Sequence, residues 1–286
     1  MRYTIQQFHR EFPDNDTCLL HLFEQRFPQP TCSACSRVGS FHKHPTRACY
    51  TCNCGKTHIF PKCGTIFQKS STDLVKWYFA IFLMSQSRNG VAAKEIERHV
   101  GVTYKTAWRM AHEIRKLMDD GNSPLSGEIE CDETYIGGKQ RGQSGRSHAR
   151  KTVVFGAVER GGRLNANVVP DASTKSLQPY IEGFVSPDSQ LLTDEWKPYK
   201  SIAKSLKMIH RTVRHGYRQY VAADGTHVNN IESFWSQLKR SIDGTHHVIS
   251  PKYASLYVAE FEFRYNARNE GQHLFPKLVG LVGPTV

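Results

Sequence analysis

The chain has 286 residues, of which 39% are hydrophobic and 11% aromatic, so it can bury a sizeable core and global disorder is excluded. Its 38 basic and 26 acidic residues give a net charge of +12, which favours a polyanionic partner such as DNA or RNA over a membrane. No apolar run approaches the ~20 residues that span a bilayer, and we find no apolar signal region, so we expect a cytoplasmic protein.

Residues 1–28 predict a helical lead-in, which Pro28 and Pro30 end. Residues 29–68 then hold six of the eight cysteines. In a reducing compartment, such clustering indicates a metal site more often than disulfides. We therefore predict a small zinc ribbon over residues 29–68.

Two short cysteine knuckles in this ribbon can supply four ligands to a tetrahedral Zn²⁺, which stabilises the module rather than catalysing. The first knuckle is Cys32 with Cys35. The second pairs Cys52 either with Cys49, which is the commoner spacing, or with Cys54, after which a glycine permits a tight turn. We narrowly favour Cys52 with Cys54 and keep Cys49 as the alternative ligand. Buried free cysteines or an iron–sulfur site are the competing interpretations.

Residues 69–120 are predicted to form a helix-turn-helix region. Gly101 supplies a turn between two helical patterns, and Thr103 can cap the second helix. Such a helix can enter a major groove of DNA, with basic side chains on phosphates and polar tips on base edges. Its outer face would offer Tyr104, Lys105, Thr106, Arg109 and Arg115. An ordinary helical hairpin with a solvated basic face fits this pattern equally well.

A break at residues 121–124 separates this region from residues 126–270. There, strand-like runs alternate with helical patterns, and a helical stretch follows from residue 227. This order predicts an α/β sheet domain. We expect residues 271–286 to form a C-terminal tail.

Three carboxylates in this domain suit metal chemistry. Asp132 lies in a strand-like run where apolar residues alternate with it, so its side chain points away from the apolar side. Asp194 follows another strand-like run, at the edge where α/β sheets usually bind ligands, with Glu195 as a neighbouring alternative. Glu232 lies on a helical run.

Each carboxylate alone has a simpler explanation: an exposed edge strand, a helix N-cap or a charged helix surface. A carboxylate near a sheet interior nevertheless needs a neutralising partner, and hard divalent cations are partners of that kind. The three together favour a site for two Mg²⁺ or Mn²⁺ ions. Two such ions can clamp the attacking and leaving oxygens of a phosphoryl transfer.

Other side chains could support this site. Lys239 could bind a DNA phosphate beside the metal, while His227 and Asn230 could orient metal or water. The Gly-rich segment 137–151 could clamp a phosphate backbone, which is compatible with a disordered hairpin tip. Its basic residues include Lys139, Arg141, Arg146 and Arg150.

Six motifs extend over nearly the whole chain from residue 30 to 270: "CGTIF", "GVTYKTAWRMAHEIR", "ECDETYIGGK", "LTDEW", "HVNNIESFWSQLKR" and "EFEFRYNAR". With them the chain resembles bacterial insertion-sequence transposases of the ISXO-like family, which join a zinc ribbon, a helix-turn-helix and a DDE catalytic core. The resemblance implies an RNase H-like fold, a mixed sheet with flanking helices, in which Asp132, Asp194 and Glu232 hold two Mg²⁺ ions. It also matches Lys239 to a basic residue after the glutamate and lets Asn229 or Asn230 share the third position.

The resemblance further implies cleavage at terminal inverted repeats and transfer of 3′-hydroxyl ends into double-stranded target DNA. The zinc ribbon and the helix-turn-helix would recognise the repeats, and pairing of two ends suggests at least a dimer associated with the nucleoid. Two other classes stay open. One is a catalytically inactive DNA-binding regulator, and the other is an RNase H-like nuclease without strand transfer.

Overall fold

The structure is a computed structural model that describes residues 3–119, 121, 123–137, 151–213, 221–222, 225–269 and 274–283. The chain divides into two compact units. The first comprises Met1–Ser87, Ala93–Leu117 and Glu270–Val286, and the second comprises Arg88–Ala92 and Met118–Asn269. None of the helices in the described ranges has the length and apolar character needed to cross a bilayer.

The first unit opens with two helices, α1 (Ile5–Glu11) and α2 (Asn15–Arg26). Thr4 and Asp14 cap them, each accepting a hydrogen bond from a backbone N–H in the first turn. A small antiparallel sheet follows, with the order β1–β2–β3. Its strands are β1 (Phe41–Lys43), β2 (Tyr50–Cys52) and β3 (His58–Ile59).

Three further helices follow: α3 (Leu74–Gln86), α4 (Ala93–Val100) and α5 (Tyr104–Leu117). The turn between α4 and α5 contains Gly101 at φ 67°, a left-handed conformation that favours glycine. Ile96 on α4 and Ala107 on α5 are fully buried, as an apolar inner face requires.

The segment expected to be a C-terminal tail instead contains a helix, α10 (Leu274–Gly280), which belongs to the first unit. Its Phe275 ring is buried and lies 5.7 Å from the ring of Phe8 and 5.9 Å from that of Phe82. Leu274, Phe275 and Leu278 have helical spacing, which explains why this short segment folds onto an apolar core.

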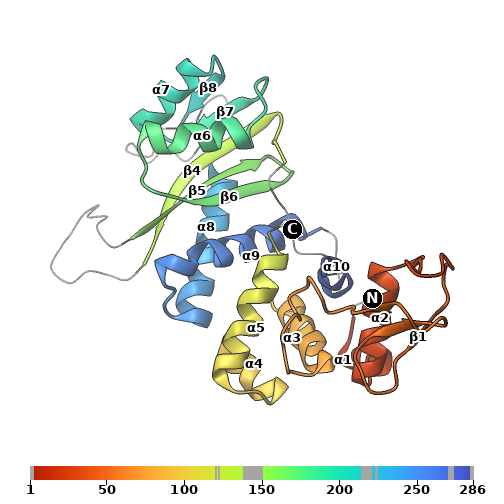
Figure 1. Ribbon diagram of the computed structural model, residues 1–286. Coiled ribbons are helices and arrows are strands. Elements are labelled where there is room, and N and C mark those ends of the chain that lie inside the picture. Colours follow the sequence, from red (N-terminus) through yellow and green to blue (C-terminus); the bar gives the residue numbers. More distant parts are fainter. Residues whose placement is uncertain are drawn as a thin grey trace. The chain divides into compact units, whose positions relative to one another are not determined.

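The second unit contains a mixed five-stranded sheet with the order β6–β5–β4–β7–β8 (Figure 1). The first three strands pair antiparallel, whereas β4, β7 and β8 run parallel. The expected mixed α/β class is thus confirmed. The strands are β4 (Glu128–Ile136), β5 (Thr152–Glu159), β6 (Leu164–Val169), β7 (Gln190–Thr193) and β8 (Ile209–Thr212).

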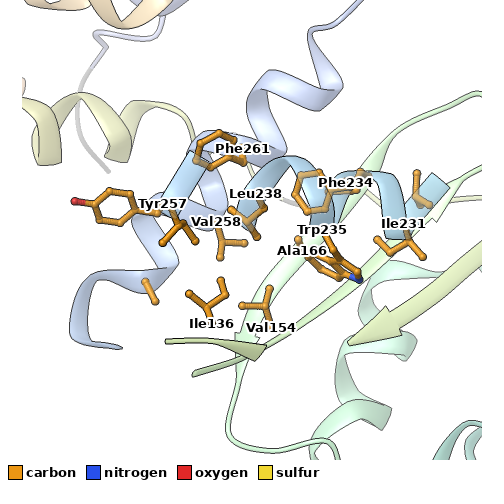
Figure 2. Packing of buried hydrophobic residues seen from close by; sticks show 14 of the residues in the cluster. Ile136, Val154, Ala166, Ile231, Phe234, Trp235, Leu238, Tyr257, Val258 and Phe261 are labelled. Atoms are coloured by element: carbon orange, nitrogen blue, oxygen red, sulfur yellow. The ribbon is translucent and has the colours of Figure 1, made fainter. Parts of the chain in front are cut away.

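Helices cover both faces of this sheet. On one face lie α6 (Thr174–Phe184) and α7 (Lys197–Ser205), in a core that includes Cys131. On the other lie α8 (Asn229–Ser241) and α9 (Ala254–Asn266), in a core that includes Ile136 (Figure 2). A π-helical turn (Ile242–His246) and a 3-10 turn (Pro251–Tyr253) connect α8 to α9. Because strand side chains alternate between faces, Glu130, Asp132 and Thr134 share the α8 face.

Candidate functional site

Asp132 lies in the central strand of the sheet. It is half-buried, and its cross-strand partner on β5 is Gly156. Because β4 has a neighbour on each side, the exposed edge-strand interpretation of Asp132 does not hold. Burial, the carboxylate of Glu133 and that of Asp194 together raise the pKa of Asp132 well above its usual range.

Asp194 comes directly after β7, the parallel neighbour of β4. Glu130 on β4 pairs with Leu192 on β7. Continuing this register by two residues would bring Asp132 beside Asp194 on the same face, which agrees with the effect of the Asp194 carboxylate on the pKa of Asp132. Asp194 does not cap α7, since the N-cap is Trp196. Instead, the Asp194 Oδ1 accepts a 2.9 Å hydrogen bond from the Trp196 backbone N–H, which fixes the carboxylate at the strand end.

Glu232 lies in the first turn of α8, the helix that packs over Asp132. The Trp235 Nε1 donates a 3.0 Å hydrogen bond to the Asp132 Oδ2, which joins helix and strand at the site. Figure 2 shows Trp235 reaching from α8 toward the sheet. The oxygens of Asp132, Asp194 and Glu232 do not all lie within 4.8 Å of one another in the described structure.

Glu130, to which the sequence patterns assign no role, is a highly connected carboxylate of this face. It is fully buried. Its Oε2 accepts hydrogen bonds from the backbone N–H groups of Asn230 at 2.8 Å and Ile231 at 3.2 Å. Its Oε1 accepts from Asn230 Nδ2 at 2.8 Å and from Arg160 Nε at 3.2 Å, with His227 Nδ1 3.1 Å away. Its position two residues before Asp132 was the signal available in the sequence.

This network changes the interpretation of two residues. Asn230 and His227 were expected to orient metal or water, but both direct a side-chain nitrogen to Glu130. Lys239 is exposed on the last turn of α8. Lys139, Arg141, Arg146 and Arg150 lie outside the described residues.

The cysteine cluster lies in the first unit. Cys32, Cys35, Cys52 and Cys54 bring their sulfur atoms within 4.8 Å of one another, with Cys32–Cys54 at 3.6 Å and Cys35–Cys52 at 3.7 Å. Zn–S bonds of about 2.3 Å in a tetrahedron place sulfurs about 3.8 Å apart, so this donor set fits Zn²⁺. Cys49 is buried outside this group. The Thr57 hydroxyl, 3.1 Å from Cys32 Sγ, is the main cause that lowers the pKa of Cys32 to about 6.

Helix α5 presents part of the expected basic face. Tyr104, Lys105 and Arg109 are exposed, and Thr106 is half-buried. Arg115 corrects the expectation, because its side chain is only 1% exposed. It follows Ala111 by four residues and so continues the buried stripe of the helix rather than the outer face.

Comparison with known proteins identifies the class. Residues 124–266 match the family described as the ISXO2-like transposase domain, and the chain belongs to that family. It is 25% identical over 253 residues, which are 82% of this chain and 84% of the relative, to an uncharacterized protein in transposable element ISH50 of Halobacterium salinarum. It is 30% identical over 99 residues, 35% of this chain and 77% of the relative, to an uncharacterized transposase-like protein of Haemophilus influenzae.

A solved structure of the simian T-cell lymphotropic virus intasome in complex with PP2A regulatory subunit B56 gamma also matches. The match covers 63% of this chain and 64% of that chain at 15% identity, with a TM-score of 0.30, which is too low to establish a shared fold.

Proposed function

We propose that this chain is a metal-dependent DNA transposase that cleaves at the ends of its element and transfers the 3′-hydroxyl ends to target DNA. The observation that carries this proposal is the approach of Asp194, directly after β7, to Asp132 on the neighbouring strand β4, beside α8, whose first turn contains Glu232. The mixed sheet with helices on both faces supports an RNase H-like core.

The chemistry of these side chains fits divalent metal. Burial first, and then the carboxylates of Glu133 and Asp194, raise the pKa of Asp132, so its ionised form is disfavoured at this place and a hard cation would stabilise it. Asp132, Asp194 and Glu232 would hold two Mg²⁺ or Mn²⁺ ions, which would supply an activated hydroxyl and stabilise the leaving oxygen. Two hydrogen bonds would hold these carboxylates in place: one from the Trp235 indole N–H to Asp132 and one from the Trp196 backbone N–H to Asp194.

The first unit would bind DNA. Four cysteine ligands make a closed zinc site, which stabilises a small module without catalysing. Lys105 and Arg109 on α5 would contact phosphates at the terminal repeats, and the net charge of +12 supports a DNA partner. Pairing of two element ends would require at least two copies of the chain.

The test uses purified full-length protein and DNA carrying the sequences that flank its own gene. We expect Mg²⁺-dependent 3′-end nicking and joining by the wild type and their loss in Glu232→Gln. The matched control is Asp188→Asn, which removes the charge of an exposed carboxylate in the turn before β7 and should keep activity.

Two results would overturn the proposal. Specific DNA binding that Mg²⁺ and Asp132→Asn leave unchanged, with no cleavage in Mg²⁺ or Mn²⁺, would indicate a DNA-binding regulator. Cleavage without any joined product would indicate a nuclease.

A further inference from the structure

Helix α8 begins without a side-chain cap of its own. Its N-cap residue is Val228, which has no side chain able to accept a hydrogen bond. The first N–H groups of a helix lack intrahelical partners and carry partial positive charge, so a buried helix start needs an acceptor. The Glu130 carboxylate on β4 provides it by accepting from the N–H groups of Asn230 and Ile231.

The same carboxylate is tied to the loop that precedes α8. Arg160, at the end of β5, donates to Glu130 and also to the backbone carbonyls of Gly225 and His227. Arg160 also forms a 2.7 Å ion pair with Glu128, which lies on β4 two residues before Glu130. The guanidinium thus compensates the buried charge of Glu130 and holds the entry to α8 against β4.

Helix and strand are therefore joined at two points, with Glu232 between them. On β4 these points are Glu130 and Asp132, two residues or about 6.7 Å apart. On α8 they are Ile231 and Trp235, four residues or about 6 Å apart. Because the two spacings match, both bonds form together, and they fix how far along β4 the first turn of α8 lies.

We propose that Glu130 is a positioning residue, which sets the first turn of α8 so that Glu232 stands over Asp132 and Asp194. This inference rests on the proposed metal site. Glu130 is not itself a ligand, because a carboxylate has about four acceptor positions and protein donors already occupy them.

The decisive variant is Glu130→Gln, which keeps the size of the side chain and removes its charge. In the full-length protein we would measure Mn²⁺ affinity by electron paramagnetic resonance and hydrogen exchange of the peptide covering residues 229–235. Residues that orient metal ligands typically contribute 10–100-fold in affinity, so we expect Mn²⁺ binding to weaken by at least about tenfold. Exchange of the 229–235 peptide should accelerate, while that of the β5 peptide covering residues 153–158 stays slow.

The matched control is Glu128→Gln. Glu128 lies on β4 as Glu130 does, faces the same side and pairs with Arg160, and within the described part of the chain its ion pair is with this arginine rather than with α8. Its loss should change Mn²⁺ affinity by less than about threefold, because a partly exposed ion pair contributes little. Asp132→Asn serves as the reference for loss of a ligand.

Each outcome decides the inference. If Glu130→Gln binds Mn²⁺ as the wild type does while Asp132→Asn does not, Glu130 has no positioning role and the proposed metal site stands. If Asp132→Asn also binds like the wild type, the metal site fails, and the inference fails with it. If Glu130→Gln does not fold, Asn230→Ala replaces it, since this change removes only one bond to Glu130. Weaker Mn²⁺ binding by Asn230→Ala then supports positioning, and unchanged binding overturns it.

Discussion

The indole of Trp235 lies over Gly156, and the missing side chain of this glycine is what lets the ring reach Asp132. A Cβ atom at Gly156 would come within 2.7 Å of the Trp235 Cη2. Gly156 on β5 is the cross-strand partner of Asp132 on β4. The glycine and the carboxylate therefore lie side by side beneath α8.

Gly156→Ala should therefore destabilise the protein by about 1–3 kcal/mol, the usual range for overpacking a core. Urea unfolding of the full chain measures this change. The control is Gly183→Ala in α6, where a Cβ meets nothing within 4 Å, so the helix should gain about 0.5–1 kcal/mol. Equal stability of Gly156→Ala and the wild type would show that α8 does not lie as close to β5 as described.

Asp132→Asn should stabilise the protein in buffer without added Mg²⁺ or Mn²⁺. Burial first, and then Glu133 and Asp194, raise the pKa of Asp132 in the folded state above its unfolded value. Protonated Asp132 thus contributes stability that is fully present below the unfolded pKa and is lost as pH rises through the folded pKa. At pH 8 the asparagine variant should gain about 0.5–2 kcal/mol, the range of typical stabilising changes, and the gain should vanish in acid.

Asp171→Asn is the control of opposite sign in this experiment. Hydrogen bonds from Ser173 and Ser176 lower the pKa of Asp171, so its charge favours the folded state above the unfolded pKa. The asparagine variant should be less stable than the wild type at pH 8. An Asp132→Asn variant that also loses stability at pH 8 would contradict the account given for Asp132.

Cys54→Ser should lose bound zinc, and Cys49→Ala should keep it. Cys54 belongs to the four sulfurs gathered within 4.8 Å, whereas Cys49 is buried outside them. Zinc content of the purified protein, measured by elemental analysis, should fall from one ion per chain to well below one only in Cys54→Ser. Zinc retained by Cys54→Ser and lost by Cys49→Ala would reverse the assignment of the fourth ligand.

Arg109 and Arg115 should behave differently although both are arginines on α5. Arg109→Ala removes an exposed cation, so DNA binding should weaken and the slope of log K against log salt should fall by about 1. Arg115 is buried, so Arg115→Ala should lower the free energy of unfolding by about 1–3 kcal/mol. Fluorescence anisotropy against salt concentration and urea unfolding separate the two effects. A reduced salt slope in the folded Arg115→Ala variant would show that Arg115 does contact DNA.

Much of this architecture follows from local patterns. Alternating apolar residues around Asp132 predict its strand, and helical spacing predicts α8. Helical spacing also places Arg115 on the buried face of α5, four residues after Ala111. The prediction that it lies on the outer face followed its positive charge instead of this spacing, and it was wrong. The apolar spacing around Phe275 was present in the sequence as well, but a helix of seven residues has weak local preferences and needs a core to pack on.

The role of Glu130 could not be predicted in this way. Its partners on α8 are a hundred residues away along the chain, so no local pattern relates them. Likewise, the approach of Asp194 to Asp132 depends on the pairing of β4 with β7, two strands that the β5–β6 hairpin and α6 separate in the sequence. Contacts of this range depend on the complete sheet rather than on any short segment.

Helix α10 also determines when the first unit can complete its core during synthesis. Phe8 leaves the ribosome long before Phe275, although the two rings lie 5.7 Å apart in the folded protein. The second unit, between them in the sequence, can complete its sheet earlier, while the N-terminal core waits. A product that ends before residue 274 would therefore lack the Phe275 ring that packs beside Phe8 and Phe82, and would leave that side of the aromatic core open to water.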